Sequence, residues 1–214
     1  MTLLKTIPNY IIFIAFCILL VLFTFAFNNT IITDNLYFSF FSNQIAYERI
    51  EEIIAQKQKL AWLGYVFVPV IFLLKFTVIS LIILTGFFFF EKKVSFLFVF
   101  KAVMLAEIPF LFIPLIKSIW FMFIQTKYSL EDVSYFFPLS VLQLFNIKSL
   151  SSWQIYPLQL FNVFELIYWV LLAFWLKIFL NISINKSMEV VVSSYGTGLL
   201  LWVVFITFLT LSLT

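Results

Sequence analysis

Five apolar runs, each long enough to cross a membrane as a helix, constrain this chain more than any other feature of its sequence. A helix needs about 20 residues to cross the hydrocarbon core of a bilayer. The runs cover residues 7–27, 62–90, 94–126, 158–180 and 188–212. They lack the alternation of barrel strands, and with 11% charged residues the chain could not coat a soluble globule. The sequence therefore predicts an all-α polytopic transmembrane bundle, a single domain over residues 1–214.

The third run, 94–126, is expected to be the central helix. It carries Glu107 within its apolar stretch, followed by Pro109 and Pro114. Because lipid satisfies neither a freed carbonyl nor an unpaired carboxylate, this segment must face protein or a wet cavity. We interpret the two prolines as a structural kink. The alternative is a helix broken at a substrate site, as in secondary transporters, but five spans do not divide into an inverted repeat.

Three ionisable residues, Lys75, Glu107 and Glu165, lie inside the apolar runs. Each costs about 2.5–3.5 kcal/mol at mid-membrane, so each should face the bundle and find a partner. The simplest arrangement is a Lys75–Glu107 ion pair, with Glu165 satisfied by Tyr, Ser or Asn groups or by a proton. Such a cluster either fixes helix register or serves as a proton or cation relay. The structural role is favoured.

The segments between the runs predict further helices. Residues 43–59 have apolar side chains at helical spacing, with acids early and lysines late, as the helix dipole prefers. This amphipathic helix either lies in water beside the membrane or leads into the second span, or it docks a partner. Its charged face carries Glu48, Arg49, Glu52 and Lys57. Residues 127–157 are predicted to form short interfacial helices, since no piece of them is long enough to span.

The last run contains a series of small side chains. These are Ser193, Ser194, Gly196 and Gly198. Small residues let membrane helices approach closely, so this series predicts a helix-packing face.

Several classes of function find no support in the residues. The chain has no histidine, one cysteine and four glycines, and no hydrolase, zinc-protease, phosphate-loop or dinucleotide motif. The sequence therefore predicts no catalytic residue, no metal site and no cofactor. A net charge of +3 without a basic block argues against nucleic acid as a partner.

The C-terminal two-thirds of the chain resembles the Yip1 superfamily of membrane proteins. The matching stretches are Ser95–Phe96 continuing through Phe100–Leu111, then Asn162–Trp169 with Leu171–Phe174, and the turn Asn181–Ser187. Glu91-Lys92-Lys93 replaces the glycine-rich turn that often precedes the Ser-Phe start in that family. The resemblance implies five spans and a cytoplasmic N-terminus. Eukaryotic members are implicated in vesicle trafficking with small GTPases, whereas bacterial members are largely uncharacterised.

These patterns predict a non-enzymatic membrane protein that acts as a scaffold or accessory subunit of a larger membrane complex. The bilayer and other membrane proteins are its expected partners, and the sequence names no small-molecule substrate. The alternative is a small secondary transporter or permease that uses Lys75, Glu107 and Glu165. The expected location is the bacterial cytoplasmic (inner) membrane. The positive-inside rule, with six inner lysines against five basic residues in the outer loops, places the N-terminus inside and the C-terminus outside.

Overall fold

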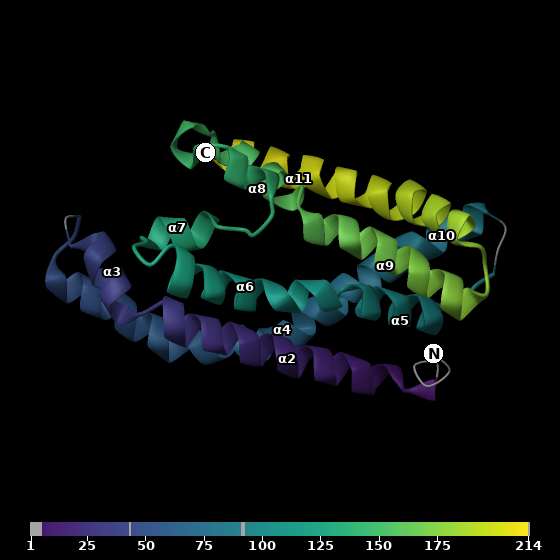
Figure 1. The fold of residues 1–214 in the computed structure, drawn as a ribbon, viewed down its shortest axis with the longest axis horizontal. Coiled ribbons are helices and arrows are strands. Elements are labelled where there is room, and N and C mark those ends of the chain that lie inside the picture. Colours follow the sequence, from purple (N-terminus) through teal and green to yellow (C-terminus); the bar gives the residue numbers. More distant parts are fainter. Residues whose placement is uncertain (1–5, 43, 91–92, 214) are drawn as a thin grey trace.

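The computed structural model describes residues 6–42, 44–90 and 93–213. Within them, five helical segments are long and apolar enough to cross a membrane, so the prediction of a multi-pass helical protein is confirmed. They are α2 (Asn9–Ile31), α4 (Tyr47–Phe89), the segment Phe96–Ile124, α9 (Val163–Leu180) and the segment Ile184–Leu213. Figure 1 shows them running alongside one another along the long axis of the molecule. Residue 43 of the predicted amphipathic helix and residues 91–92 of the predicted charged turn lie outside the described residues.

Helix α5 (Phe96–Ala106) occupies the centre of the bundle. Every residue from Val99 to Ala106 is buried, Lys101 included. The helix packs against α2, α4 and α9. The expectation that the third span is central is therefore confirmed for its first half.

The second half of this span changes its winding at the two prolines. After α5 come the 3-10 segment η1 (Ile108–Phe112), α6 (Ile113–Ile119) and the π-helical segment η2 (Trp120–Ile124). Pro109 lies within η1 and Pro114 in the first turn of α6. A proline has no N–H to donate to the preceding turn, so the α-helical ladder is interrupted at each of them. Turns of different pitch keep the chain helical across the interruption.

Helix α4 unites two predicted elements. The sequence predicts an amphipathic stretch at 43–59 and a span at 62–90, and the structure joins them in one helix of 43 residues from Tyr47 to Phe89. Nothing between Lys59 and Trp62 stops a helix, and lysine, leucine and alanine favour one. Pro69 is accommodated inside it. Of the alternatives for the amphipathic stretch, the one that leads into the second span is the arrangement found.

A short helix that the sequence did not predict, α3 (Asp34–Phe41), folds back onto α4. Lys57 Nζ of α4 donates a hydrogen bond to the carbonyl of Ile32 (3.1 Å) and lies 4.4 Å from the ring centre of Tyr37. Burial raises the pKa of the Tyr37 hydroxyl, and the charge of Asp34 raises it further. The Lys57 ammonium therefore packs on a neutral Tyr37 ring and satisfies the carbonyl of Ile32, the C-cap residue of α2.

The long connection before the fourth span contains four short helical pieces. They are α7 (Leu130–Tyr135), η3 (Val141–Leu144), η4 (Ile147–Ser149) and α8 (Ser152–Leu160). The fourth span begins at Val163 rather than at residue 158, because the Asn162 side chain accepts a hydrogen bond from the Glu165 backbone N–H (2.8 Å) and caps α9.

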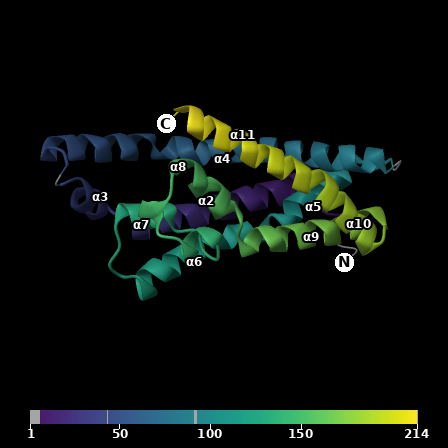
Figure 2. The same cartoon turned by 90° about the horizontal axis from the view of Figure 1, so that it is seen from above.

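The fifth span begins at Ile184 rather than at residue 188. It comprises α10 (Ile184–Val190), the π-helical segment η5 (Val191–Gly196) and α11 (Thr197–Leu213). Figure 2 shows α11 rising away from α9 after the two helices meet near α10. A wedge therefore opens between α9 and α11 on the side away from α10.

Candidate functional site

The first half of the candidate site is an ion pair between the second and third spans. Lys75 Nζ contacts Glu107 Oε1, as the sequence predicts. The Glu107 side chain is 2% exposed, whereas that of Lys75 is 39% exposed. Glu107 follows directly after α5. The Lys75 ammonium also lies 5.4 Å from the ring centre of Phe110. The glutamate is therefore held inside the bundle and the lysine reaches it from the rim.

The second half is a carboxylate with two hydrogen-bond donors. Glu165 Oε1 accepts from Trp169 Nε1 (2.8 Å), one turn along α9, and from the Tyr195 hydroxyl of η5 (2.8 Å). The sequence predicted that a Tyr, Ser or Asn group would satisfy Glu165, and a tyrosine does. The two halves are linked through aromatic rings: Phe110, near Lys75, contacts Tyr168, and the Tyr168 ring contacts Tyr195. The three predicted ionisable residues thus belong to one connected set of side chains.

Two buried polar atoms beside these carboxylates have no hydrogen-bond partner within the part of the chain that is described. They are Glu107 Oε2 and the Tyr168 hydroxyl. The Tyr168 ring lies between Phe110 (6.0 Å between centres) and Tyr195 (5.2 Å). Buried polar atoms of proteins almost always have partners, so these two atoms are exceptions. We call Lys75, Glu107, Glu165, Tyr168 and Tyr195 the polar centre.

An apolar cavity of about 680 Å³ opens beside the polar centre, in the wedge between α9 and α11. Its walls are mainly aliphatic side chains of the two helices, and the preceding connection contributes Leu139, Val141, Leu160 and Phe161. Glu165 and Asn162 are the polar residues that contrast with this lining. The volume falls within the range of about 300–1,000 Å³ that is usual for ligand sites in proteins. We call this space the α9–α11 cavity.

Backbone pairing fixes the part of the cavity wall that the connection contributes. Val141 N–H donates to the Phe161 carbonyl (2.8 Å), and Val163 N–H donates to the Leu139 carbonyl (3.2 Å). Leu139 has φ 58°, a left-handed conformation that is uncommon for a residue with a branched side chain. Such strain persists where the surroundings impose it, often at ligand-binding sites. Leu139 is 63% exposed and lines the cavity.

The predicted helix-packing face is only partly used within the chain. A Cβ at Gly86 of α4 would lie 2.7 Å from Ser194 Cβ, and one at Gly196 would lie 2.9 Å from the Trp169 ring. Gly198 has the same relation to Ile82, at 3.0 Å. Ser193 is exposed and does not share this face; its hydroxyl donates to the Glu189 carbonyl of its own helix (2.6 Å). Adjacent residues of a helix do not face the same way, so Ser193 and Ser194 cannot both belong to one packing face.

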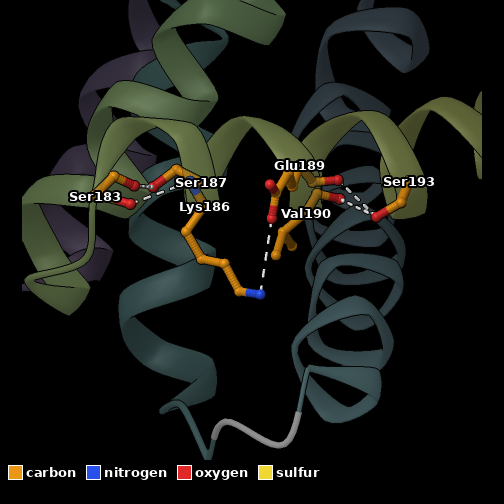
Figure 3. A network of polar contacts seen from close by, with 6 residues as sticks. All are labelled: Ser183, Lys186, Ser187, Glu189, Val190 and Ser193. Carbon is orange, nitrogen blue, oxygen red and sulfur yellow. Dashed lines mark hydrogen bonds and ion pairs between the residues drawn. The ribbon is translucent and has the colours of Figure 1, made fainter.

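The start of the last span carries its own polar network (Figure 3). The Ser183 hydroxyl caps α10 by accepting from the Lys186 N–H (3.3 Å). The side chain of Lys186 reaches Glu189 Oε2 (3.7 Å) and lies 3.6 Å from the ring centre of Phe90. These contacts tie the fifth span to the end of the second, where α4 stops.

The predicted docking residues of α4 divide into two groups. Glu48, Arg49 and Glu52 are exposed, and Arg49 Nη1 pairs with Glu52 Oε2 at 2.5 Å within their own helix. Lys57 instead makes contacts within the chain, with the Ile32 carbonyl and the Tyr37 ring. The free part of this surface is therefore the first turn and a half of α4.

Sequence reasoning did not single out Tyr168, Trp169 or Tyr195, nor the α9–α11 cavity. The spacing of Glu165 and Trp169, four residues apart, places them on one helix face and is a usable signal. No pattern in the sequence connects Tyr195 with Glu165, since they meet only through the packing of η5 on α9.

No protein-family model, no curated protein and no solved structure matches this chain significantly. The resemblance to the Yip1 superfamily therefore rests on the quoted residues alone and stays a prediction.

Proposed function

We propose that this chain is a non-enzymatic integral membrane protein that acts as a scaffold or accessory subunit of a larger membrane protein complex. Its location would be a bacterial cytoplasmic membrane with the N-terminus inside, in keeping with the Yip1-like pattern and the distribution of lysines.

The observation that carries this proposal is the exposure of α11, which packs mainly on η5 and α8 in the described chain and leaves the rest of its surface uncovered. None of its 17 residues is buried, although the helix is strongly apolar. In the most apolar window of the last span 0% of residues are buried, against 56% for the third span. Peripheral helices of a bundle usually bury one face, and small and aromatic side chains pack on neighbours there. The side of α11 that no described residue covers fits a helix that meets another protein.

The outer side of α11 gives the proposed partner surface. Leu201, Phe205 and Phe208 recur at helical spacing and are 51–64% exposed. They are not among the residues that line the α9–α11 cavity. The exposed charged turn at the start of α4 supplies a second, polar contact area for a partner outside the lipid.

Site-specific photo-crosslinking in intact membranes tests the proposal. A benzophenone amino acid at position 205 or 208 should give discrete protein adducts of constant mass. The matched control is the same probe at Ile14 or Ile18 of α2, which are 51% and 54% exposed and belong to another apolar surface. Lipid adducts alone at positions 205 and 208, together with a monomeric and partnerless protein in mild detergent, would refute a subunit role.

A second candidate function, a small transporter or permease, is favoured by the unpartnered Glu107 Oε2 and Tyr168 hydroxyl. A proton or small cation could pass between the carboxylates of the polar centre. The test is flux in reconstituted vesicles. Glu107→Gln and Lys75→Met, if folded, should abolish a pH-dependent flux; the absence of such a flux in the unaltered protein would remove this candidate.

A further inference from the structure

The α9–α11 cavity has a shape that a single chain can enter and a helix cannot. Trp169 of α9 and Gly196 of η5 are in contact at its narrow end, where a Cβ on the glycine would come within 2.9 Å of the indole. From there α11 diverges from α9 (Figure 2). A helix with its side chains is about 10–12 Å wide and could not reach the apex of this wedge. A flexible hydrocarbon chain could.

The lining sets the chemistry of such a ligand. The walls are aliphatic, with Leu166 on α9 and Leu200 and Val203 on α11 among them. Glu165 is the charged residue that the cavity exposes, and no lysine or arginine takes part in the lining. An anionic headgroup would meet only a carboxylate here. A positively charged hydrogen-bond donor would instead meet the carboxylate of Glu165.

The charge balance of the polar centre points the same way. Its described ionisable side chains comprise two carboxylates, Glu107 and Glu165, and one ammonium, Lys75. Lys75 is paired with Glu107. One oxygen of Glu165 accepts hydrogen bonds from Trp169 and Tyr195, and among the described residues no lysine or arginine forms a salt bridge with it. A carboxylate in an apolar setting is strongly stabilised by an opposite charge.

We propose that the α9–α11 cavity binds a single-chain amphiphile with a primary ammonium head, the chain filling the wedge and the head pairing with Glu165. This site is independent of the partner surface on the other side of α11.

The test uses the full chain in nanodiscs and a long-chain primary amine that carries a photoactivatable diazirine in its chain. Labelling should saturate and should concentrate in peptides that contain Leu166 and Leu199–Val204. The same chain with a carboxylate head should label these peptides at least about tenfold less, the effect of losing one charge-assisted hydrogen bond.

Two variants and one control refine the result. Glu165→Gln should reduce amine labelling by about tenfold, again as one charged contact is lost. Val203→Phe should reduce it by filling the wedge, and it leaves every charge in place. Glu189→Gln removes an equally negative but remote, 60% exposed side chain and should leave labelling unchanged.

The proposal fails if labelling is spread evenly over all five spans, if both headgroups label equally, or if Glu189→Gln matches Glu165→Gln. Should Glu165→Gln not fold, the comparison of headgroups on the unaltered protein and the Val203→Phe variant decide the question.

Discussion

Gly86 of α4 and Ser194 of η5 touch so closely that a Cβ at position 86 would lie 2.7 Å from both Cβ and Oγ of the serine. Val190 adds a contact at 3.2 Å. The second and fifth spans are thus in contact at a point where any larger residue must push them apart. This contact decides how the last span is oriented and, through it, where α11 leaves the bundle.

We expect Gly86→Ala to destabilise the protein by about 1–3 kcal/mol, the usual cost of overpacking. Thermal unfolding in detergent should show a midpoint lowered by several degrees, since about 1 kcal/mol shifts the midpoint by about 2–4 °C in a chain of this size. Gly64→Ala, in the same helix but with nothing within 4 Å, is the control and should not lower it. Adding Ser194→Gly should restore part of the loss; an unchanged midpoint in the first variant would contradict the close contact.

The Lys75–Glu107 pair should respond asymmetrically to substitution. Lys75→Met leaves a carboxylate that is 2% exposed without its counter-charge and should cost about 3–5 kcal/mol. Glu107→Gln should cost less, because Lys75 is 39% exposed and can turn outward. The double variant should recover most of the loss. Unfolding midpoints of all three measure this, and Glu52→Gln at the exposed Arg49 pair should change stability by less than about 0.5 kcal/mol.

Two buried tyrosines of the polar centre should behave oppositely when their hydroxyls are removed. Tyr195→Phe deletes a donor to Glu165 and should cost about 1–3 kcal/mol. Tyr168→Phe deletes a hydroxyl without a partner in the described chain and should be neutral or stabilising. If Tyr168→Phe proves as costly as Tyr195→Phe, a water or proton occupies that space, and the transporter candidate gains.

The order of the spans predicts which loops share a side of the membrane. In a Cys17→Ser background, cysteines at Lys93 and Lys186 should both react with an impermeant maleimide from one side. A cysteine at Lys148 should react only from the other. Accessibility in right-side-out and inverted vesicles tests this, and the proposed orientation places positions 93 and 186 inside. Equal labelling of positions 93 and 148 from one side would exclude five crossings.

The number and type of the spans follow from hydropathy alone, because a lipid-exposed backbone must satisfy its own hydrogen bonds. The boundaries do not. Lys57 and Lys59 mark the point where the sequence changes from polar to apolar, and α4 continues through this point without a break. Asn162 and Ser183 set the start of the last two spans by capping α9 and α10. Asparagine and serine are common outside caps as well, so the sequence alone does not identify these two residues as caps.

The ion pair of the polar centre was predictable, since two opposite charges in neighbouring spans have few other partners. The hydrogen bond from Tyr195 was not, because it depends on the rotation of the last span. The π-helical turn of η5 (Val191–Gly196) lies just where that rotation is set, and it is not marked by any pattern in the sequence. The α9–α11 cavity arises from the angle between two helices, which no sequence pattern records.

The length of α4 has one more consequence. Its 43 residues extend about 65 Å, whereas the hydrocarbon core is about 30 Å thick. Since the apolar stretch 62–90 crosses the core, the first 15 residues of α4, about 22 Å of helix, extend beyond it at the end that carries Glu52. Lys75 follows Glu52 by 23 positions, so the two residues lie about 35 Å apart along the helix axis. A partner bound at the first turns of α4 would therefore be held at a fixed distance from the bilayer.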